Sequence, residues 1–271
     1  MAEKGDKAKA MAGGTDILVQ LRADRFRIER LVDVKGVPEM MEISYSKKDG
    51  LTLGAAVPCY KVYENKEIAK AYPGLYDSAS LIGGIQIQSR ASIGGNLCNA
   101  APSGDAIPSL IAYQAVANIQ GPKGKRSVPA EQFCTGPGKN ILERGELLVS
   151  IKFPAPKAGT GANYLRFIPR NEMDIAVAGA GVSVVLANGA ITSARIALVS
   201  VAPTPVLATE AMQYLAGKAP TDEHVEHAAE LAKKAAKPIT DMRGTIEQRI
   251  HLTGVLTKRA LRTAISRAKE A

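Results

Sequence analysis

The alternation of apolar and polar residues divides the chain into two parts with different patterns. Before residue 155, short strand-like runs at 8–12, 30–34 and 50–57 are interspersed with helical segments at 16–25 and 59–72. From 175 to 201, two long strand-like runs flank Asn188-Gly189, a strong signal for a two-residue hairpin. Helices are predicted after it, near 207–216, 222–236 and 245–268. This pattern predicts an α/β region followed by an antiparallel sheet with helices.

The remaining elements of the first part are predicted from the same pattern. Helices are expected over 75–82 and 105–114, a hairpin over 115–130, and a strand over 145–153 that Pro154 ends. Residues 154–163 are rich in Pro, Gly and small side chains, which is typical of a linker. We therefore predict a first region over residues 1–155, with subdomains of about 1–54 and 55–155, and a C-terminal domain over 162–271.

Composition restricts the class of protein. The chain of 271 residues is 46% apolar and 23% charged, which is enough apolar material for a sizeable core. It has no run of eighteen apolar residues, and its first ten residues lack the apolar core of a signal peptide. We therefore expect a cytoplasmic protein with no transmembrane segment.

The net charge of +9 favours an acidic partner or nucleic acid. The aromatic content is only 4%, with no Trp, which argues against binding single strands through base stacking. Much of the excess charge lies in the C-terminal helices. It is interpreted either as a solvated face or as a surface for an acidic partner subunit.

Several apparent motifs do not support chemistry. The three cysteines are scattered, with no C-x-x-C, so neither a zinc site nor a disulfide framework is expected. The run GAGVSV at 179–184 lacks the third glycine of a dinucleotide fingerprint and precedes a strand rather than a helix. His224 and His227 lie among glutamates on a polar helix face, which favours a solvated surface over a metal site.

Two glycine-rich segments share one pattern, AGGTD at 12–16 and SIGGN at 92–96. Each places a Gly pair before a short polar side chain. Glycine lets a ligand approach the backbone without a Cβ clash, and successive N–H groups can converge on an anion. The segments therefore predict a diphosphate cradle made of backbone, with Thr15 and Asn96 adding side-chain hydrogen bonds. The alternative is a pair of tight structural turns.

Asp105 comes nine residues after the second segment, at the start of a predicted helix. It could cap that helix. It could instead accept hydrogen bonds from the hydroxyl groups of a sugar alcohol. A carboxylate and a phosphate are both negative and repel each other. The second role would therefore suit a ligand that carries a polyol as well as a diphosphate.

The two glycine segments and several downstream segments together resemble a known family. AGGTD, then RASIGGNLCNAAPSGD, GELLVSIKFP, RFIPRNEMDIAVAGAGVSV, ARIALVSVAPTPV and RGTIEQRIHLTGVLTKRAL occur in the order found in the FAD-binding medium subunit of the molybdenum hydroxylases. That family includes xanthine dehydrogenase and aerobic carbon monoxide dehydrogenase. The resemblance covers nearly the whole chain.

The resemblance implies an α+β fold. Two N-terminal α/β subdomains of the FAD-binding PCMH or vanillyl-alcohol-oxidase-like type hold FAD between them, and an antiparallel sheet with helices comes after them. It implies that Asp105 contacts the ribityl-diphosphate region, that Leu148 lies beside the cofactor, and that Arg166 stands where xanthine dehydrogenase has a lysine near the isoalloxazine. The diphosphate would be held by the two segments: Ala12, Gly13, Gly14, Thr15, Asp16, Ser92, Ile93, Gly94, Gly95 and Asn96.

The resemblance also implies the function. FAD on this chain would take electrons from a small iron–sulfur subunit with 2Fe–2S clusters and pass them to an external acceptor. A large subunit would carry the molybdenum cofactor, and a dimer of heterotrimers is expected. No catalytic side chain is implied on this chain, because the redox chemistry belongs to the cofactor. The alternatives are a stand-alone FAD oxidoreductase and a basic nucleic-acid-binding module.

The sequence departs from the family pattern in two places. Family members usually begin with an extra strand and helix, whereas about eleven residues precede Ala12 here. Either the chain is short or its true start lies upstream, and an incomplete first subdomain would weaken FAD retention. The subfamily that reduces hydroxybenzoyl-CoA carries an inserted loop with four cysteines for a further cluster. Three scattered cysteines cannot bind that cluster in the same way.

Overall fold

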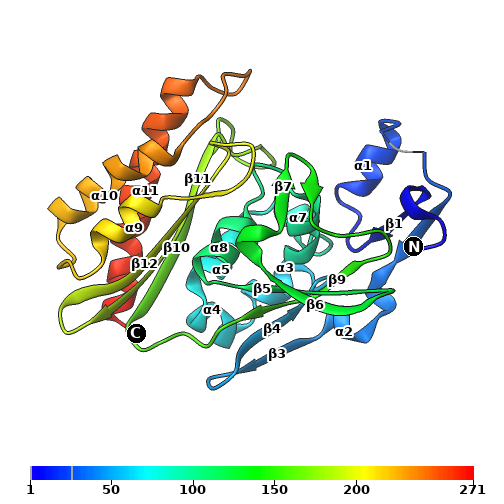
Figure 1. Cartoon of the computed structure of the whole chain (residues 1–271), viewed down its shortest axis with the longest axis horizontal. Coiled ribbons are helices and arrows are strands. Elements are labelled where there is room, and N and C mark those ends of the chain that lie inside the picture. Colours follow the sequence, from blue (N-terminus) through cyan, green and yellow to red (C-terminus); the bar gives the residue numbers. More distant parts are fainter. Residues whose placement is uncertain (1, 26) are drawn as a thin grey trace.

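The computed structural model describes residues 2–25 and 27–271. Figure 1 shows a small N-terminal unit, a central sheet with helices, and a C-terminal sheet with helices on its outer side. Within the described residues, no helix is long and apolar enough to cross a membrane.

The N-terminal unit is a two-stranded parallel sheet. Strands β1 (Ala8–Met11) and β2 (Arg30–Asp33) pair in register, and α1 (Ile17–Arg22) connects them. A short 3-10 helix, η1 (Gly5–Lys7), precedes β1, and another, η2 (Val34–Gly36), follows β2. The first glycine segment comes directly after β1, so the end of this strand positions residues 12–16.

The central sheet is antiparallel, with the strand order β3-β4-β9-β5-β6. Its strands are β3 (Ile43–Ser46), β4 (Gly50–Gly54), β5 (Val116–Gly121), β6 (Gly124–Pro129) and β9 (Leu147–Phe153). Strands β3 and β4 come before the subdomain boundary predicted near residue 54, yet they belong to the same sheet as β5, β6 and β9. We propose that the division falls before β3.

Six helices lie between β4 and β5, and all of them except α6 share one apolar core with this sheet. They are α3 (Cys59–Tyr63), α4 (Lys66–Ala71), α5 (Pro73–Leu81), α6 (Ile85–Gln88), α7 (Ile93–Asn99) and α8 (Ala106–Ala112). The remaining short elements are α2 (Pro38–Met41), η3 (Ala130–Gln132), β7 (Cys134–Gly136) and β8 (Lys139–Asn140).

The single helix predicted over 59–72 is interrupted. Asn65 breaks it because its side-chain Oδ1 accepts hydrogen bonds from the N–H groups of Glu67 and Ile68 and so caps α4. Helix α4 ends at Ala71, and Pro73 begins α5, where its missing N–H costs nothing.

The C-terminal sheet has the antiparallel order β10-β11-β12-β13. Its strands are β10 (Thr160–Phe167), β11 (Ala178–Ala187), β12 (Ala190–Val199) and β13 (Val206–Leu207). The predicted hairpin at Asn188-Gly189 is present, and both residues have positive φ, 51° and 75°. Strand β10 begins inside the predicted linker, so the irregular connection is shorter than expected.

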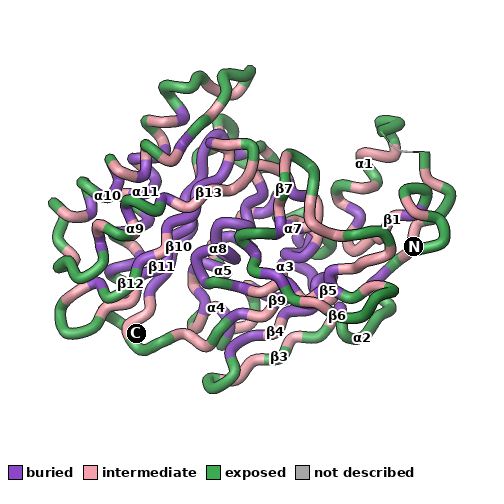
Figure 2. Tube along the Cα trace, in the orientation of Figure 1, coloured by how far each residue is buried: buried purple, intermediate pink, exposed green. Residues whose placement is uncertain are grey.

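The two faces of the C-terminal sheet bury different partners. One face shares an apolar core with α9 (Thr209–Leu215), α10 (Asp222–Ala235) and α11 (Ile246–Lys269). The other packs against α5 and α8 of the central part. Figure 2 shows the resulting buried zone, to which α8 contributes all seven of its residues.

The glycines of the run GAGVSV make this second contact possible. A Cβ on Gly181 would lie 2.6 Å from Pro108 Cβ, and one on Gly179 would lie 3.0 Å from the Tyr164 hydroxyl. Gly181 therefore allows close contact between β11 and α8, and Gly179 leaves room for the Tyr164 side chain of the neighbouring strand.

Candidate functional site

The two glycine segments lie against each other. The Arg90 side chain donates from Nε to the carbonyl of Gly13 at 3.3 Å. A Cβ on Gly13 would come within 1.7 Å of the Arg90 carbonyl oxygen, so no other residue fits there. Residues separated by almost eighty positions in sequence thus form one continuous stretch of backbone surface.

Polar side chains join the helices that begin at the two segments. Asn99, the last residue of α7, donates to Asp16 Oδ1 at 3.2 Å. Gln20 of α1 in turn donates to Asn99 Oδ1 at 3.3 Å. This chain of hydrogen bonds fixes α1 relative to α7.

The second glycine segment is the start of a helix rather than a loop. Ser92 is the N-cap of α7, and its Oγ accepts from the N–H of Gly95 at 3.0 Å. Ile93, Gly94, Gly95 and Asn96 form the first turn. The N–H groups of Gly95 and Asn96 bond to Ser92, which leaves those of Ile93 and Gly94 as the donors of this turn that lack an acceptor in their own helix and suit an anion.

The four glycines are required for different reasons. Gly13 and Gly94 are packed against backbone, since a Cβ on Gly94 would lie 2.4 Å from the Ala55 carbonyl oxygen. Gly14 has φ of +83°, which favours glycine. A Cβ on Gly95 would meet only the tip of the Ser92 side chain. Of the four, Gly95 alone is not explained by backbone contact or backbone conformation within the described residues.

Capping of α8 is done by Asn96 and not by Asp105. The Asn96 Oδ1 accepts from the N–H of Ala106 at 3.0 Å. Asp105 occupies the N-cap position but makes no capping hydrogen bond with its side chain. The capping role considered for Asp105 is therefore wrong, and the side-chain oxygen of Asn96 is already in use. Thr15 lies half-buried in the turn that leads into α1.

Asp105 instead forms a buried polar group with two residues of β10. Its Oδ1 accepts from the Tyr164 hydroxyl at 2.7 Å, and its Oδ2 accepts from Arg166 Nη1 at 2.5 Å. Burial raises the pKa of Asp105 to about 6, although the Arg166 charge and both hydrogen bonds act in the opposite direction. Tyr164 was not among the residues predicted from sequence, and only its spacing of two from Arg166 on one strand would have pointed to it.

Arg166 is left with an unused donor. Its side chain is only 6% exposed, and its Nε is buried without a hydrogen-bond partner among the described residues. A buried donor without an acceptor is costly, so this atom is suited to an acceptor on a ligand.

Leu148 lies on β9 at a bulge. Leu148 pairs with Ile119 and Ser150 with Asn118, which leaves Val149 as the extra residue. Leu148 is 2% exposed and points into the core, while the Val149 carbonyl accepts from the N–H of Ala55. Strand β9 packs against α7, and Ala55 is the residue against which Gly94 packs. The bulge therefore supports the second glycine segment from behind.

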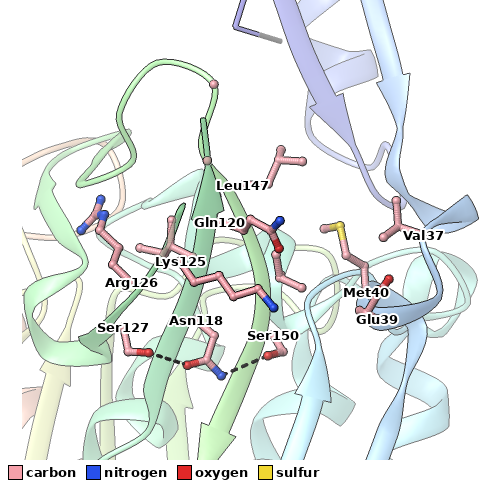
Figure 3. Close-up of a pocket in the computed structure, with 14 residues that line it drawn as sticks. Val37, Glu39, Met40, Asn118, Gln120, Lys125, Arg126, Ser127, Leu147 and Ser150 are labelled. Carbon is pink, nitrogen blue, oxygen red and sulfur yellow. Dashed lines mark hydrogen bonds between the residues drawn. The ribbon is translucent and has the colours of Figure 1, made fainter. Parts of the chain in front are cut away.

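A groove of about 680 Å³ lies elsewhere, on the outer face of β5, β6 and β9 beside α2. Figure 3 shows Lys125, Gln120 and Ser150 with Val37 and Met40 around it. None of the described residues that line it belongs to either glycine segment or to the Asp105 group. We therefore assign the candidate site to the glycine segments.

Comparison with known proteins agrees with this assignment. The family model for the FAD binding domain in molybdopterin dehydrogenase matches residues 1–156. The chain belongs to this family. A second family model, for the CO dehydrogenase flavoprotein C-terminal domain, matches residues 163–264. The family membership predicted from the sequence motifs is confirmed.

Individual relatives are similar over nearly their whole length. The chain is 34% identical to the xanthine dehydrogenase FAD-binding subunit of Escherichia coli O157:H7, over 97% of this chain and 90% of that protein. It is 32% identical to the carbon monoxide dehydrogenase medium chain of Hydrogenophaga pseudoflava, over 98% and 92%.

Solved structures give the same result for the fold. Carbon monoxide dehydrogenase from Hydrogenophaga pseudoflava matches with a TM-score of 0.93 and 34% identity, over 98% of this chain and 92% of that one. Quinoline 2-oxidoreductase from Pseudomonas putida 86 matches with a TM-score of 0.90 and 28% identity, over 97% and 91%. The predicted α+β fold with a C-terminal sheet and helices is confirmed.

Proposed function

We propose that this chain is the FAD-binding subunit of a multi-subunit molybdenum hydroxylase. It would accept electrons from an iron–sulfur subunit and pass them to an external acceptor. The observation that carries the proposal is the contact between the two glycine segments, which makes one backbone surface at the start of α7 in a chain of this family. Neither a stand-alone oxidoreductase nor a nucleic-acid-binding module is favoured by a specific observation.

The chemistry of the donors and acceptors fits FAD. A diphosphate needs N–H donors, which the first turn of α7 and the turn at residues 12–16 offer. A polyol needs acceptors, and each oxygen of Asp105 can accept a further hydrogen bond beyond those from Tyr164 and Arg166. The buried Nε of Arg166 supplies a donor without a partner among the described residues. When bound, FAD supplies the capacity to take up and release electrons.

Each part of the site then has a defined task. Residues 12–16 and 92–96 would bind the diphosphate through backbone, and Asp105 would orient the ribityl hydroxyl groups. Arg166 would place a fixed positive charge at the flavin end, and Leu148, which is buried in the core, would support the apolar wall from behind. No residue of this chain is assigned a proton-transfer step.

We also propose the partners and the compartment from the relatives. Proteins named as medium chains and subunits are parts of larger assemblies, so a large molybdenum subunit and a small iron–sulfur subunit are the expected partners. We propose a cytoplasmic location together with these partners. Several basic residues of α11 pair within the chain, as Arg262 does with Asp222 and Lys258 with Glu226, which supports the interpretation of that charge as a solvated face.

The sharpest test substitutes Gly95. Gly95→Ala adds one methyl group that backbone contacts permit, so the fold should be retained and helix propensity improved. If the open side of Gly95 faces the diphosphate, FAD affinity should fall at least about tenfold, or ~1.4 kcal/mol, measured by titration with the deflavinated chain in the presence of its partner subunits. Gly36→Ala is the matched control, because a Cβ there meets nothing within 4 Å. Wild-type protein that binds no FAD even with its partners would overturn the proposed function.

A further inference from the structure

Tyr164 is buried beside the proposed flavin site, and its hydroxyl has a defined place. The residue is 1% exposed, and its hydroxyl donates to Asp105 Oδ1 at 2.7 Å. Opposite Tyr164 in the register of β10 and β11 stands Gly181, and opposite Arg166 stands Gly179. The absence of a side chain at Gly179 leaves the room that the hydroxyl occupies, since a Cβ there would lie 3.0 Å from it.

The backbone of Tyr164 is held as firmly as its side chain. Its N–H donates to Asp77 Oδ2 at 3.2 Å, and Asp77 also accepts from Arg267 of α11. The hydroxyl therefore projects from a strand that is fixed to both neighbouring parts of the chain. Such a donor can hold a carboxylate in one orientation.

We propose that Tyr164 is a positioning residue of the flavin site, whose hydroxyl holds the Asp105 carboxylate in the orientation that accepts hydrogen bonds from the polyol of FAD. This inference rests on the proposed function and adds to it, because the family resemblance gives roles to Asp105 and Arg166 but none to Tyr164. Arg166 supplies the charge beside Asp105, and Tyr164 supplies the neutral donor that fixes its other oxygen.

The surroundings of Asp105 leave few other groups to consider. The charged or titratable groups that act on it from the described residues are Arg166 and Tyr164, both on β10. Strand β11 presents Gly179 and Gly181 to this face, and α7 contributes Asn96, whose Oδ1 is bonded to the N–H of Ala106. Residues of α8 near Asp105 are apolar or neutral.

The pH dependence of FAD affinity distinguishes a role of the Tyr164 hydroxyl in holding Asp105 from a role in packing alone. Burial raises the pKa of Asp105 to about 6, and the Tyr164 hydrogen bond lowers it. Removing the hydroxyl therefore raises the pKa further. A ligand that binds the ionised carboxylate gains affinity as pH rises to the pKa of the free protein and then reaches a plateau. Loss of the hydroxyl should move the start of that plateau to higher pH.

The experiment is a titration of deflavinated full-length chain, with its partner subunits, with FAD at a series of pH values. Wild-type affinity should rise with pH through about 6 and become constant roughly one pH unit above that value. Tyr164→Phe should reach its plateau at a higher pH, so its loss of affinity relative to wild type should be larger near pH 6 than above pH 8. Tyr72→Phe is the control, since it removes another buried hydroxyl, bonded to the Pro154 carbonyl at 2.9 Å.

The outcomes separate the inference from the proposed function. If Tyr164→Phe weakens FAD binding by one constant factor at every pH, the hydroxyl contributes only to structure and the inference is wrong. If wild type binds no FAD, the proposed function fails first. Should Tyr164→Phe not fold, Gly179→Ala places a Cβ 3.0 Å from the hydroxyl and 2.8 Å from Val199 Cγ2 while retaining the tyrosine, and it should move the plateau in the same direction. An unmoved plateau in that folded variant would also overturn the inference.

Discussion

Arg267 and Asp77 form a two-point ion pair across 190 positions of sequence. The guanidinium donates to Asp77 Oδ2 at 2.6 Å and to Oδ1 at 3.0 Å. Asp77 belongs to α5 of the central part, and Arg267 lies near the end of α11. Arg267 also donates to the carbonyl of Ala162, and Asp77 accepts from Asn163. The pair thus joins α5, β10 and α11, and it fixes the strand that carries Tyr164.

Removing one partner of this pair should destabilise the whole chain. Arg267→Met leaves Asp77, whose side chain is 12% exposed, without its charged donor. Because the arginine is 31% exposed, the loss should be below that of a fully buried pair, at about 2 kcal/mol in the free energy of unfolding. Urea denaturation measures it. Arg262→Met on the same helix removes a more exposed pair with Asp222 and should cost under about 1 kcal/mol. Equal losses for the two variants would contradict this explanation.

Gly181 should not tolerate a methyl group. A Cβ there would lie 2.6 Å from Pro108 Cβ and 2.7 Å from the Pro108 carbonyl carbon, and neither can move without shifting α8. Gly181→Ala should lower the free energy of unfolding by about 1 to 3 kcal/mol, although alanine is normally better than glycine in a strand. The control is Gly136→Ala, also on a strand, where the nearest atom would be 3.8 Å away. A neutral effect at Gly181 would mean that α8 and β11 adjust more easily than their contacts suggest.

The sequence predicted some features of the site well because they depend on local rules. The Asn188-Gly189 hairpin follows from backbone conformations that Asn and Gly adopt readily, and the glycine pairs marked where the backbone is exposed or closely approached. The role of Asp105 could not be predicted in the same way. Its partners Tyr164 and Arg166 lie about sixty residues away, and no local pattern records which strand will face the start of α8.

The capping of α8 shows the same limit. Its position in the sequence favoured Asp105 as the cap. In the structure Asn96 caps the helix, because its side chain accepts a hydrogen bond from a backbone N–H ten residues further along the chain. The membership of β3 and β4 in the central sheet was not predicted for a related reason. Strand β4 pairs with β9, nearly one hundred residues later, and sequence alone does not show that pairing.

Substitution of Asn99 should lower FAD affinity, although its side chain is not part of an apolar core. Its side chain accepts from Gln20 and donates to Asp16, so it links the helices that begin at the two glycine segments. Asn99→Ala removes two weak hydrogen bonds, and we expect FAD affinity to fall about threefold to tenfold, equivalent to roughly 1 kcal/mol. The melting temperature should change little, because both hydrogen bonds lie near the surface. Fluorescence titration with FAD and a thermal melt of the same sample measure the two effects. A large loss of stability with unchanged affinity would show that the link serves the fold instead.

Glu146 gives a prediction about acid stability with a definite sign. Arg126 donates to it from Nε at 2.7 Å and from Nη2 at 2.6 Å, and these hydrogen bonds lower the pKa of Glu146 to about 2. Because the pKa is lower in the folded state than the usual 4.5, the stabilisation is present above that value and is lost as pH falls toward 2. Glu146→Gln should therefore reduce the free energy of unfolding by about 1 to 2 kcal/mol at pH 7.

The difference in stability between Glu146→Gln and wild type should disappear at acidic pH. Near the folded-state pKa of about 2, wild-type Glu146 becomes protonated and resembles glutamine, so the two proteins should converge in stability. Urea denaturation at neutral pH and at several acidic values measures the difference. Glu143→Gln is the control, because that carboxylate bonds only to the exposed Lys123 among the side chains described. A constant difference in stability at all pH values would mean that glutamine destabilises the protein by its geometry and not by its lack of charge. The assigned cause, the carboxylate charge, would then be wrong.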